Sequence, residues 1–443
     1  MIKKLIIILI FIAVSSAKKD VVDFLFIAHD AGESYMFQPV IDNYISSTTS
    51  SSSSSESPSF IILCLGEPST TIFTTYNQSR ILSDYDINIT VLDGKDGRYQ
   101  TLSQEDLNKL TASIQTNHVI TGMVYEMEAQ IASLPYNNNN NNNNYENEMY
   151  VIGLDDSFAL WDDSSIPSTL FVKPNIVNEV FVTASVIAEA IPSTTIATTT
   201  GSPTLDAWIS VASDTESINK VRHHVYGSSI DDEFIGVVFA GGYDHAFTEY
   251  DQILYAYCHT ALELSNNNDN NDNNDNNDDY NNSGSSQIGD KKASKYRFSF
   301  SPHPGYNPLR YEIPRFHRWG CGNDVIRVIF EEEGISTASI VAASNVSMSQ
   351  CSTVGGQSLA INTPHAFGAR GSSSGSSSST CEDVFSVSDL IPFTSTTKAM
   401  VEVLTVTFAK EEYFVPTTDI IEEGIPVAAT KRMLSRLNQV FGF

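Results

Sequence analysis

The chain has 443 residues, of which 41% are hydrophobic, so it can bury large cores, and its length favours two domains. Its formal net charge of −28 argues against nonspecific nucleic-acid binding, which requires a positive surface. The negative charge supports solubility and says little about a substrate.

The first 17 residues are typical of a secretory signal peptide. Lys3 and Lys4 form a basic start, residues 5–14 are apolar, and Ser15-Ser16-Ala17 fits a small-residue cleavage site. The apolar run is short for a membrane span, although a retained signal anchor is the alternative. We expect a protein of the endoplasmic reticulum or Golgi lumen, or a secreted one, with no stable membrane span after cleavage.

Secretory entry fits four Asn-x-Ser/Thr sequons, which predict glycosylation at Asn77, Asn88, Asn281 and Asn345. Such motifs also occur by chance in a chain rich in Asn and Ser. We expect Asn345 to lie too close to a buried strand for easy modification.

Five cysteines leave one without an intramolecular partner. Cys64 lies in an apolar run and is predicted to be a buried free thiol, while Cys258 is predicted on a helix. Disulfides are expected among Cys321, Cys351 and Cys381, in a pairing that the sequence leaves open. No CxxC motif or His/Cys cluster predicts a metal site.

Four low-complexity segments interrupt the chain and are predicted to be insertions in surface loops, because they cannot bury enough apolar area to fold. They comprise residues 46–55, 137–144, 266–282 and 371–379. The aspartates of the third segment lack the glycine and terminal glutamate of a calcium-binding EF-hand loop.

Between these insertions, apolar strands alternate with helices, which favours an α/β fold with parallel sheets. In the first half we expect strands at 21–28, 60–65, 87–92, 119–124, 149–154, 181–182 and 194–199, with helices at 33–45, 104–116 and 184–190. In the second half we expect strands at 234–239, 296–301, 325–330 and 345–349, with helices at 245–264, 337–343, 354–361 and 424–440.

The two sets of elements predict two Rossmann-like domains that face a cleft. We place the first domain at residues 20–210, the second at 230–425 and a terminal helix at 426–443, with His223 and His224 in the linker between the domains. In such folds ligands bind at the carboxyl ends of the strands.

Two loops of the second domain follow predicted strands and predict a phosphate site. They are Ser301-Pro302-His303-Pro304-Gly305 and the Ser/Thr/Gly-rich stretch at 349–364. Small residues leave room for a ligand, and the N–H groups of a following helix bind phosphate. The alternative is a tight turn followed by an ordinary helix cap at Ser352 or Thr353.

With these loops in place, the chain resembles GT-B glycosyltransferases, and in particular the group that includes UDP-N-acetylglucosamine 2-epimerase and polysaccharide-synthesis transferases. The matching segments are His29-Asp30-Ala31-Gly32-Glu33 with Pro39, the stretch at 200–206, Phe239-Ala240-Gly241-Gly242, and the two loops above. They occur in the expected order over nearly the whole mature chain. One departure is that Gln357 and Ser358 stand where the family often carries a glutamate that holds the donor ribose.

The resemblance implies a nucleotide-sugar donor in the second domain and a hydroxyl acceptor, such as a glycan, in the first. Donor contacts are expected from Gly241, Gly242, His303, Arg310, Ser352, Thr353, Gly355 and Gln357. Arg315 is a second candidate cation for the diphosphate. His29 or Asp30 would act as the catalytic base, whereas Glu33 is expected to stabilise a helix N-terminus.

The predicted reaction is glycosyl transfer from a nucleotide-sugar donor, which is a substrate, without a cofactor and without a metal. Two alternatives remain open. The first is a non-catalytic secreted protein that binds glycans or has a structural role, which Gln357 and the export signal favour. The second is a nucleotide-sugar epimerase that uses acids such as Asp30, Glu33 and Asp155.

Overall fold

The computed structural model describes 19–50, 58–92, 99–122, 126–136, 149–154, 176–183, 188, 191, 193, 195–227, 234–242, 250–266, 295–303, 308–350, 352, 354–368, 394, 396–409 and 428–441. The predicted signal peptide, most of the low-complexity segments, and the site candidates Asp155, Asn281 and Thr353 lie outside these residues. No helix in the described part of the chain is long and apolar enough to cross a membrane.

The first half is built on a parallel sheet of seven described strands. Their order is β4 (Ser79–Ile81), β3 (Phe60–Cys64), β2 (Phe24–Ala28), β6 (His118–Thr121), β7 (Tyr150–Leu154), β8 (Glu179–Val182) and β9 (Ile196–Thr199). The chain moves outward from β2 on one side and then returns to place β6 on the other. The boundary between β2 and β6 is therefore the topological switch point of this sheet.

Both faces of this sheet are covered, which explains why its central strand is wholly apolar. Alternate residues of β2 enter two different cores: Leu25 and Ile27 join one, and Phe24 and Phe26 join the other. The covering elements are α1 (Ala31–Ser50), α2 (Glu67–Ile72), the 3₁₀ helix η1 (Leu82–Tyr85), α4 (Gln104–Ser113) and α5 (Glu126–Ala132). A short parallel pair, β1 (Asp20–Val21) with β5 (Ile114–Gln115), lies beside them.

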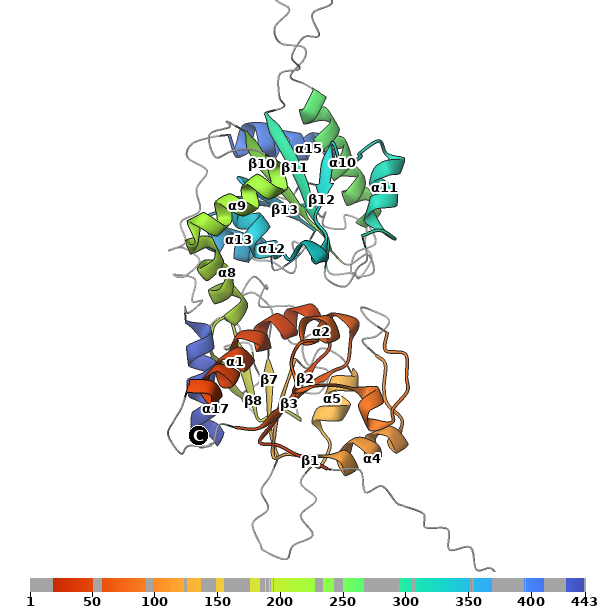
Figure 1. The fold of residues 1–443 in the computed structure, drawn as a ribbon, viewed down its shortest axis with the longest axis vertical. Coiled ribbons are helices and arrows are strands. Elements are labelled where there is room, and N and C mark those ends of the chain that lie inside the picture. Colours follow the sequence, from red (N-terminus) through yellow and green to blue (C-terminus); the bar gives the residue numbers. More distant parts are fainter. Residues whose placement is uncertain are drawn as a thin grey trace, which may run out of the picture.

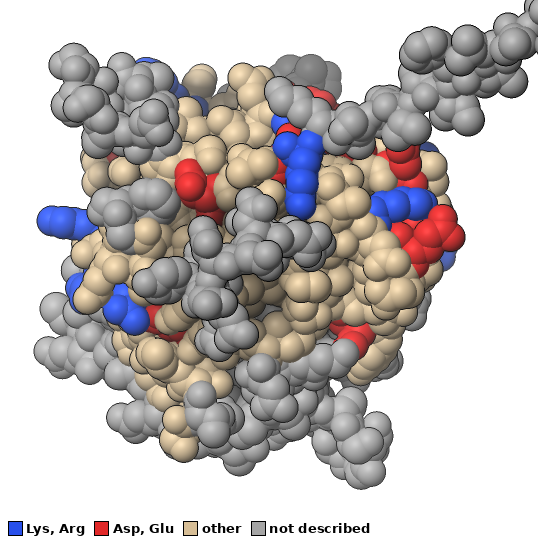
Figure 2. All heavy atoms as spheres, turned by 90° about the horizontal axis from the view of Figure 1, so that it is seen from below, with Lys and Arg blue, Asp and Glu red and all other residues tan. Residues whose placement is uncertain are grey.

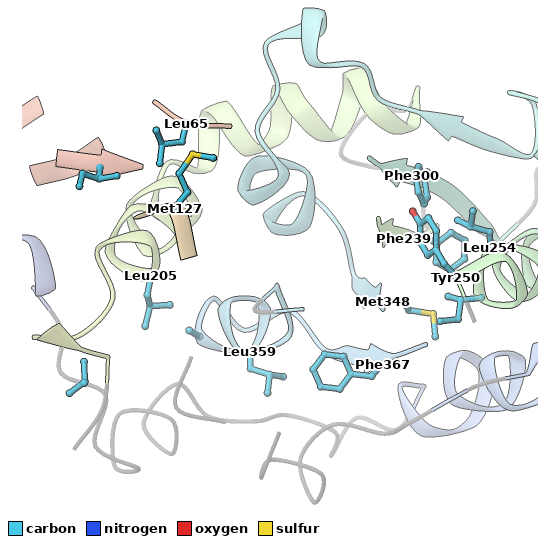
Figure 3. Packing of buried hydrophobic residues seen from close by; sticks show 14 of the residues in the cluster. Leu65, Met127, Leu205, Phe239, Tyr250, Leu254, Phe300, Met348, Leu359 and Phe367 are labelled. Carbon is cyan, nitrogen blue, oxygen red and sulfur yellow. The ribbon is translucent and has the colours of Figure 1, made fainter. Parts of the chain in front are cut away.

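The second half contains a parallel sheet of five described strands. Their order is β12 (Ile326–Val328), β11 (Tyr296–Ser301), β10 (Ile235–Ala240), β13 (Val346–Ser349) and β14 (His365–Phe367), so the switch point lies between β10 and β13. The other elements are α10 (Tyr250–Asn266), α11 (Glu312–Arg318), η4 (Glu331–Glu333), α12 (Thr337–Ala342), α13 (Val354–Ala360), α15 (Thr397–Glu402) and the π-helix η6 (Val403–Thr407). Figure 3 shows Phe239 and Phe300 of the sheet gathered with Tyr250 and Leu254 of α10.

Two helices lie at the predicted boundary between the domains: α8 (Pro203–Ser213), which begins within the predicted first domain, and α9 (Thr215–Tyr226), which lies in the predicted linker. Helix α8 contacts α1 in the first half and α12 and α13 in the second, and it lies between the two lobes in Figure 1. Its start has a clear sequence signal, because Ser202 accepts a hydrogen bond from the Leu205 N–H and Pro203 occupies the first helical position. His223 and His224 are therefore helical residues near the end of α9 rather than part of an open linker.

The C-terminal helix α17 (Ala429–Phe441) returns to the first half, where Met433 and Leu437 enter the core beside β2. Its Arg436 forms a two-pronged ion pair with the buried Glu179 of β8, at 2.8 and 3.0 Å. Figure 1 shows α17 against the same lobe as α1. The terminal helix thus ties the end of the chain to its beginning.

Three sequence predictions of structure are corrected. Residues 87–92 form no strand, because the Gln100 side chain holds this segment through the Leu92 N–H and the Thr90 carbonyl, and β4 takes the sheet edge instead. Helix α1 continues to Ser50, so the start of the serine run is helical. Cys321 pairs with Cys258, which was not expected in a disulfide, whereas Cys64 is a buried free thiol as predicted.

Candidate functional site

A cavity of about 350 Å³ lies between the two halves of the molecule. Helices α1 and α8 form one wall, and the carboxyl ends of β10 and β11 with the starts of α12 and α13 form the other. Its described lining residues are Ala31, Gly32, Tyr35, Met36, Gln38, Pro39, Ser202, Thr204, Ala207, Trp208, Val211, Ala240, Gly241, Ser301, Pro302, His303, Ser336, Thr337, Ala338, Ser352, Val354 and Gln357. The cavity therefore occupies the position at which α/β folds bind ligands.

Four of the predicted donor contacts meet at this cavity: Gly241, His303, Ser352 and Gln357. The Gly241 N–H donates to the Ser301 carbonyl at 2.8 Å, which fixes the end of β10 beside β11. A Cβ on Gly241 would lie 2.7 Å from the backbone nitrogen of His303, so glycine is required for this close approach. The two loops that the sequence singled out are thus brought together by the sheet.

The remaining predicted donor contacts lie elsewhere. Gly242 and Gly355 are buried beside the cavity, and Gly355 packs against Phe367 and His365. Arg310 is exposed and does not line the cavity. Arg315 is occupied by Asp251, with the two side chains 2.6 Å apart, and by stacking on Tyr311.

Ser352 acts as part of the local turn as well as the cavity wall, because its Oγ accepts a hydrogen bond from the Val354 N–H at 3.4 Å. Ser301 and Thr337, on the opposite side, bond each other through their hydroxyls at 2.9 Å. Ser352, Ser301 and Thr337 thus present small hydroxyl groups to the cavity. They can donate to or accept from a polar ligand without carrying charge.

The candidate bases His29 and Asp30 stand just outside the cavity, whose wall starts with the next two residues, Ala31 and Gly32. His29 is 1% exposed, and burial lowers its pKa to about 4, so its imidazole is neutral. Asp30 caps α1, because its Oδ1 accepts the Glu33 N–H at 3.1 Å. The structure thus gives Asp30 the helix-capping role that the sequence had suggested for Glu33.

Glu33 belongs to a buried acid pair with Glu128 of α5, and both side chains are 0% exposed. Burial, followed by the charge of Glu128, raises the pKa of Glu33 well above its usual value. Its Oε2 accepts the His29 N–H at 3.0 Å, and a Cβ on Gly122 would overlap its carboxyl group. The pair therefore fills the switch point of the first sheet.

The described lining of the cavity contains no Asp, Glu, Lys or Arg, and His303 and Tyr35 are its ionisable groups. Helices α1 and α8 begin at the cavity and then run along its wall, as far as Pro39 and Val211. Figure 2 views the molecule from below, and the coloured part of this surface carries scattered acidic and basic side chains. Within the described residues, no group of three or more His, Cys, Asp or Glu is placed to hold a metal ion.

The sequence did not identify the wall contributed by the first half, which includes Tyr35, Gln38 and Trp208. Trp208 was missed because no helix was predicted over residues 203–213. The signal was present, since Thr204, Ala207, Trp208 and Val211 recur at helical spacing on one face.

Neither a family model nor a curated protein sequence matches the chain. Solved structures do. UDP-GlcNAc 2-epimerase from Neisseria meningitidis aligns over 94% of this chain and 100% of its own, with 11% identity and a TM-score of 0.59. UDP-GlcNAc 2-epimerase from Methanocaldococcus jannaschii aligns over 94% of this chain and 99% of its own, with 9% identity and a TM-score of 0.54. The wall teichoic acid polymerase TagF aligns over 95% of this chain and 88% of its own, with 10% identity and a TM-score of 0.51.

These similarities define the class of fold: the chain has the two-domain GT-B architecture, as the sequence predicted. Enzymes of this architecture that use nucleotide sugars include both epimerases and glycosyltransferases.

Proposed function

We propose that the protein binds a nucleotide sugar in the cavity between its two sheets. The observation that carries this proposal is the meeting of Gly241, His303, Ser352 and Gln357 with α1 and α8 around one space. The similar structures include a Neisseria epimerase bound to UDP-GlcNAc. The donor diphosphate would lie against the hydroxyl groups and His303 of the second half, with the sugar directed toward Tyr35 and Gln38.

The reaction proposed for this site is metal-independent transfer of the sugar to a hydroxyl acceptor. The acceptor oxygen attacks the anomeric carbon, the bond to the diphosphate breaks, and the acceptor proton passes to a base. His29 is neutral and can accept a proton, and Asp30 directly precedes the wall residues Ala31 and Gly32. Either side chain must gain access to the cavity for transfer to occur.

Binding is tested by isothermal titration of the purified mature protein with uridine, cytidine and adenosine diphosphates and their sugar conjugates. We expect saturable binding that Ser352→Ala weakens several-fold. Ser213→Ala is the matched control, because Ser213 is an exposed serine on α8 that bonds only its own helix. If the wild-type protein binds none of these ligands at millimolar concentration, the proposal is wrong.

A non-catalytic binding protein is the second candidate. The observation that favours it is that neither His29 nor Asp30 lines the cavity. The same observation counts against epimerisation, because Asp30 and Glu33, two of the acids suggested for that reaction, also lie outside the lining. Saturable binding without release of nucleoside diphosphate, with or without glycan acceptors, would identify the protein as a binder.

We also propose that the protein works in the secretory pathway lumen or outside the cell. The Cys258–Cys321 disulfide supports this location, since such bonds persist in oxidising compartments. Asn77 and Asn88 are exposed and accessible for glycosylation. Asn345 is also exposed, but its Oδ1 accepts the Gly236 N–H and an Arg222 N–H. Recovery of the protein from the medium of eukaryotic cells tests the location, and peptide mapping of that protein with and without glycosidase tests the glycosylation.

A further inference from the structure

Gln350, which directly follows β13, carries a buried side-chain amide with unsatisfied hydrogen-bonding groups. The residue is 0% exposed, and neither Oε1 nor Nε2 has a hydrogen-bond partner among the residues that the structure describes. Buried polar groups are nearly always paired in native proteins, because each unpaired group loses its hydration without compensation. An amide with both its acceptor and its donor unmet therefore indicates a missing partner.

The amide is held at this position by its surroundings. It packs over Gly242, where a Cβ would overlap the Gln350 amide oxygen. The Gly242 N–H is already directed to the Tyr250 hydroxyl at 3.3 Å, and that hydroxyl donates to Glu312 at 2.9 Å. The neighbouring backbone donor is thus occupied and cannot satisfy the amide.

The position of Gln350 relates it to the cavity. Ala240 pairs with Ser349 across the sheet, so Gly241 and Gln350 lie side by side just beyond the ends of β10 and β13. Gly241, beside Gln350, and Ser352, two residues beyond it, both line the cavity. This is the switch point of the second sheet, where ligands of α/β proteins bind. Gln350 itself is buried and is not among the lining residues, so its amide lies behind this wall and must gain access to the cavity to meet a ligand.

We propose that Gln350 recognises an amide-like group of the cavity ligand, one that presents a carbonyl oxygen and an N–H side by side. This inference rests on the proposed function and specifies the chemistry of the ligand. A glutamine amide has an accepting oxygen and a donating nitrogen on one edge, so its complement must offer one donor and one acceptor. The imide edge of a uracil base does so, because the ring holds an N–H and a C=O on the same edge, whereas the trans amide of an acetamido group directs them to opposite sides.

The test uses Gln350→Met, which keeps the volume of the side chain and removes its hydrogen-bonding groups. We expect the variant to be more stable than the wild type in urea unfolding, because the unsatisfied groups are gone. We expect its affinity for UDP-GlcNAc to fall at least about tenfold. A purely structural role would not move the two quantities in opposite directions. Gln104→Met, at an exposed position on α4, is the matched control and should change neither.

Two ligand comparisons test this assignment. The wild type should bind UDP-glucose more tightly than its N3-methyluracil form, and Gln350→Met should lose this preference. The variant should weaken UDP-GlcNAc and UDP-glucose by the same factor, and a loss confined to UDP-GlcNAc would overturn the assignment.

Equal affinity of variant and wild type for every probe, or a variant that is less stable, would overturn the role of Gln350 while leaving the proposed function intact. Failure of the wild type to bind any probe would instead remove the proposed function and this inference with it.

Discussion

At the residue scale, the two switch points are filled in the same way. In each sheet a polar side chain packs over a glycine at a strand end: Glu33 over Gly122 in the first, and Gln350 over Gly242 in the second. A side chain at either glycine would overlap its partner. Both polar side chains are fully buried, so each loses its hydration on folding. The free-energy cost of this burial depends on the protonation state of Glu33 and on the hydrogen bonds of Gln350.

The buried acid pair makes stability depend on pH. The native pKa of Glu33 is raised, so the folded protein retains a proton that the unfolded chain releases near the ordinary glutamate pKa of 4.5. Stability therefore falls as pH rises from about 4.5 through the native pKa. We expect Glu128→Gln to raise the free energy of unfolding at pH 7 by about 1.4 kcal/mol for each unit by which it lowers the Glu33 pKa.

Urea unfolding between pH 4 and pH 8 measures this effect. The variant should show a flatter pH profile than the wild type, while Glu67→Gln, at an exposed position, should leave the profile unchanged. Parallel profiles for Glu128→Gln and the wild type would show that the two carboxyl groups do not interact.

At the element scale, the C-terminal helix is fixed to the first half by polar contacts at two places. The Asp206 carboxylate of α8 accepts the N–H groups of Ala428 and Thr430 at 3.0 and 3.1 Å, which caps α17. Farther along, Arg436 neutralises the buried Glu179, which also accepts hydrogen bonds from Tyr150 and Thr198. Because α8 also touches both halves, the cap links α17 to the helix that lines the cavity.

Arg436→Ala should be strongly destabilising, because it leaves the charge of Glu179 buried without its partner. We expect a loss of about 3–5 kcal/mol in the free energy of unfolding, the usual result of breaking a buried pair from one side. Lys431→Ala on the exposed face of α17 is the control and should cost less than about 0.5 kcal/mol. Adding Glu179→Gln to Arg436→Ala should restore part of the loss, and no such recovery would argue against the ion pair as the cause.

At the scale of the whole molecule, the disulfide closes a long stretch of chain within the second half. Cys258 of α10 and Cys321 after α11 are 63 residues apart in sequence, and the Asn/Asp-rich segment at 266–282 lies between Cys258 and β11. A cross-link around a loop of this length stabilises the folded state by about 4 kcal/mol in the chain-entropy model.

Reduction should therefore lower the melting temperature clearly, and Cys258→Ser/Cys321→Ser should reproduce the loss without reductant. Thermal unfolding with and without dithiothreitol measures it. Cys64→Ser, which removes the buried free thiol, is the control. Reductant should lower its melting temperature by as much as it lowers that of the wild type. An unchanged melting temperature after complete reduction, verified by thiol counting, would contradict the prediction.

Ligand binding should act on both halves at once, because the cavity draws its walls from each. At a ligand concentration 100 times the dissociation constant, the stabilisation should reach about 2.7 kcal/mol. The fluorescence of Trp208, which lines the cavity, should change in the same titration, and Trp208→Phe should lose that change. A signal that persists in Trp208→Phe would place the ligand elsewhere.

The sequence by itself determined the parallel strands β2, β3 and β10, because strands covered on both faces are read as continuous apolar runs. It also indicated β11 and β13, in which apolar residues alternate with Arg or Ser as is typical of strands. Their order along the chain was enough to indicate two Rossmann-like halves and to place His303 and Ser352 at strand ends.

Only the tertiary structure decided which groups meet. The pairing of Glu33 with Glu128, of Cys258 with Cys321, and of Gln350 with Gly242 joins residues 63 to 108 positions apart. The wall formed by α8 likewise depends on packing against α1 and α12. Local periodicity reports burial and the type of element, but contacts over such separations are set by how the sheets and helices pack, which no local pattern encodes.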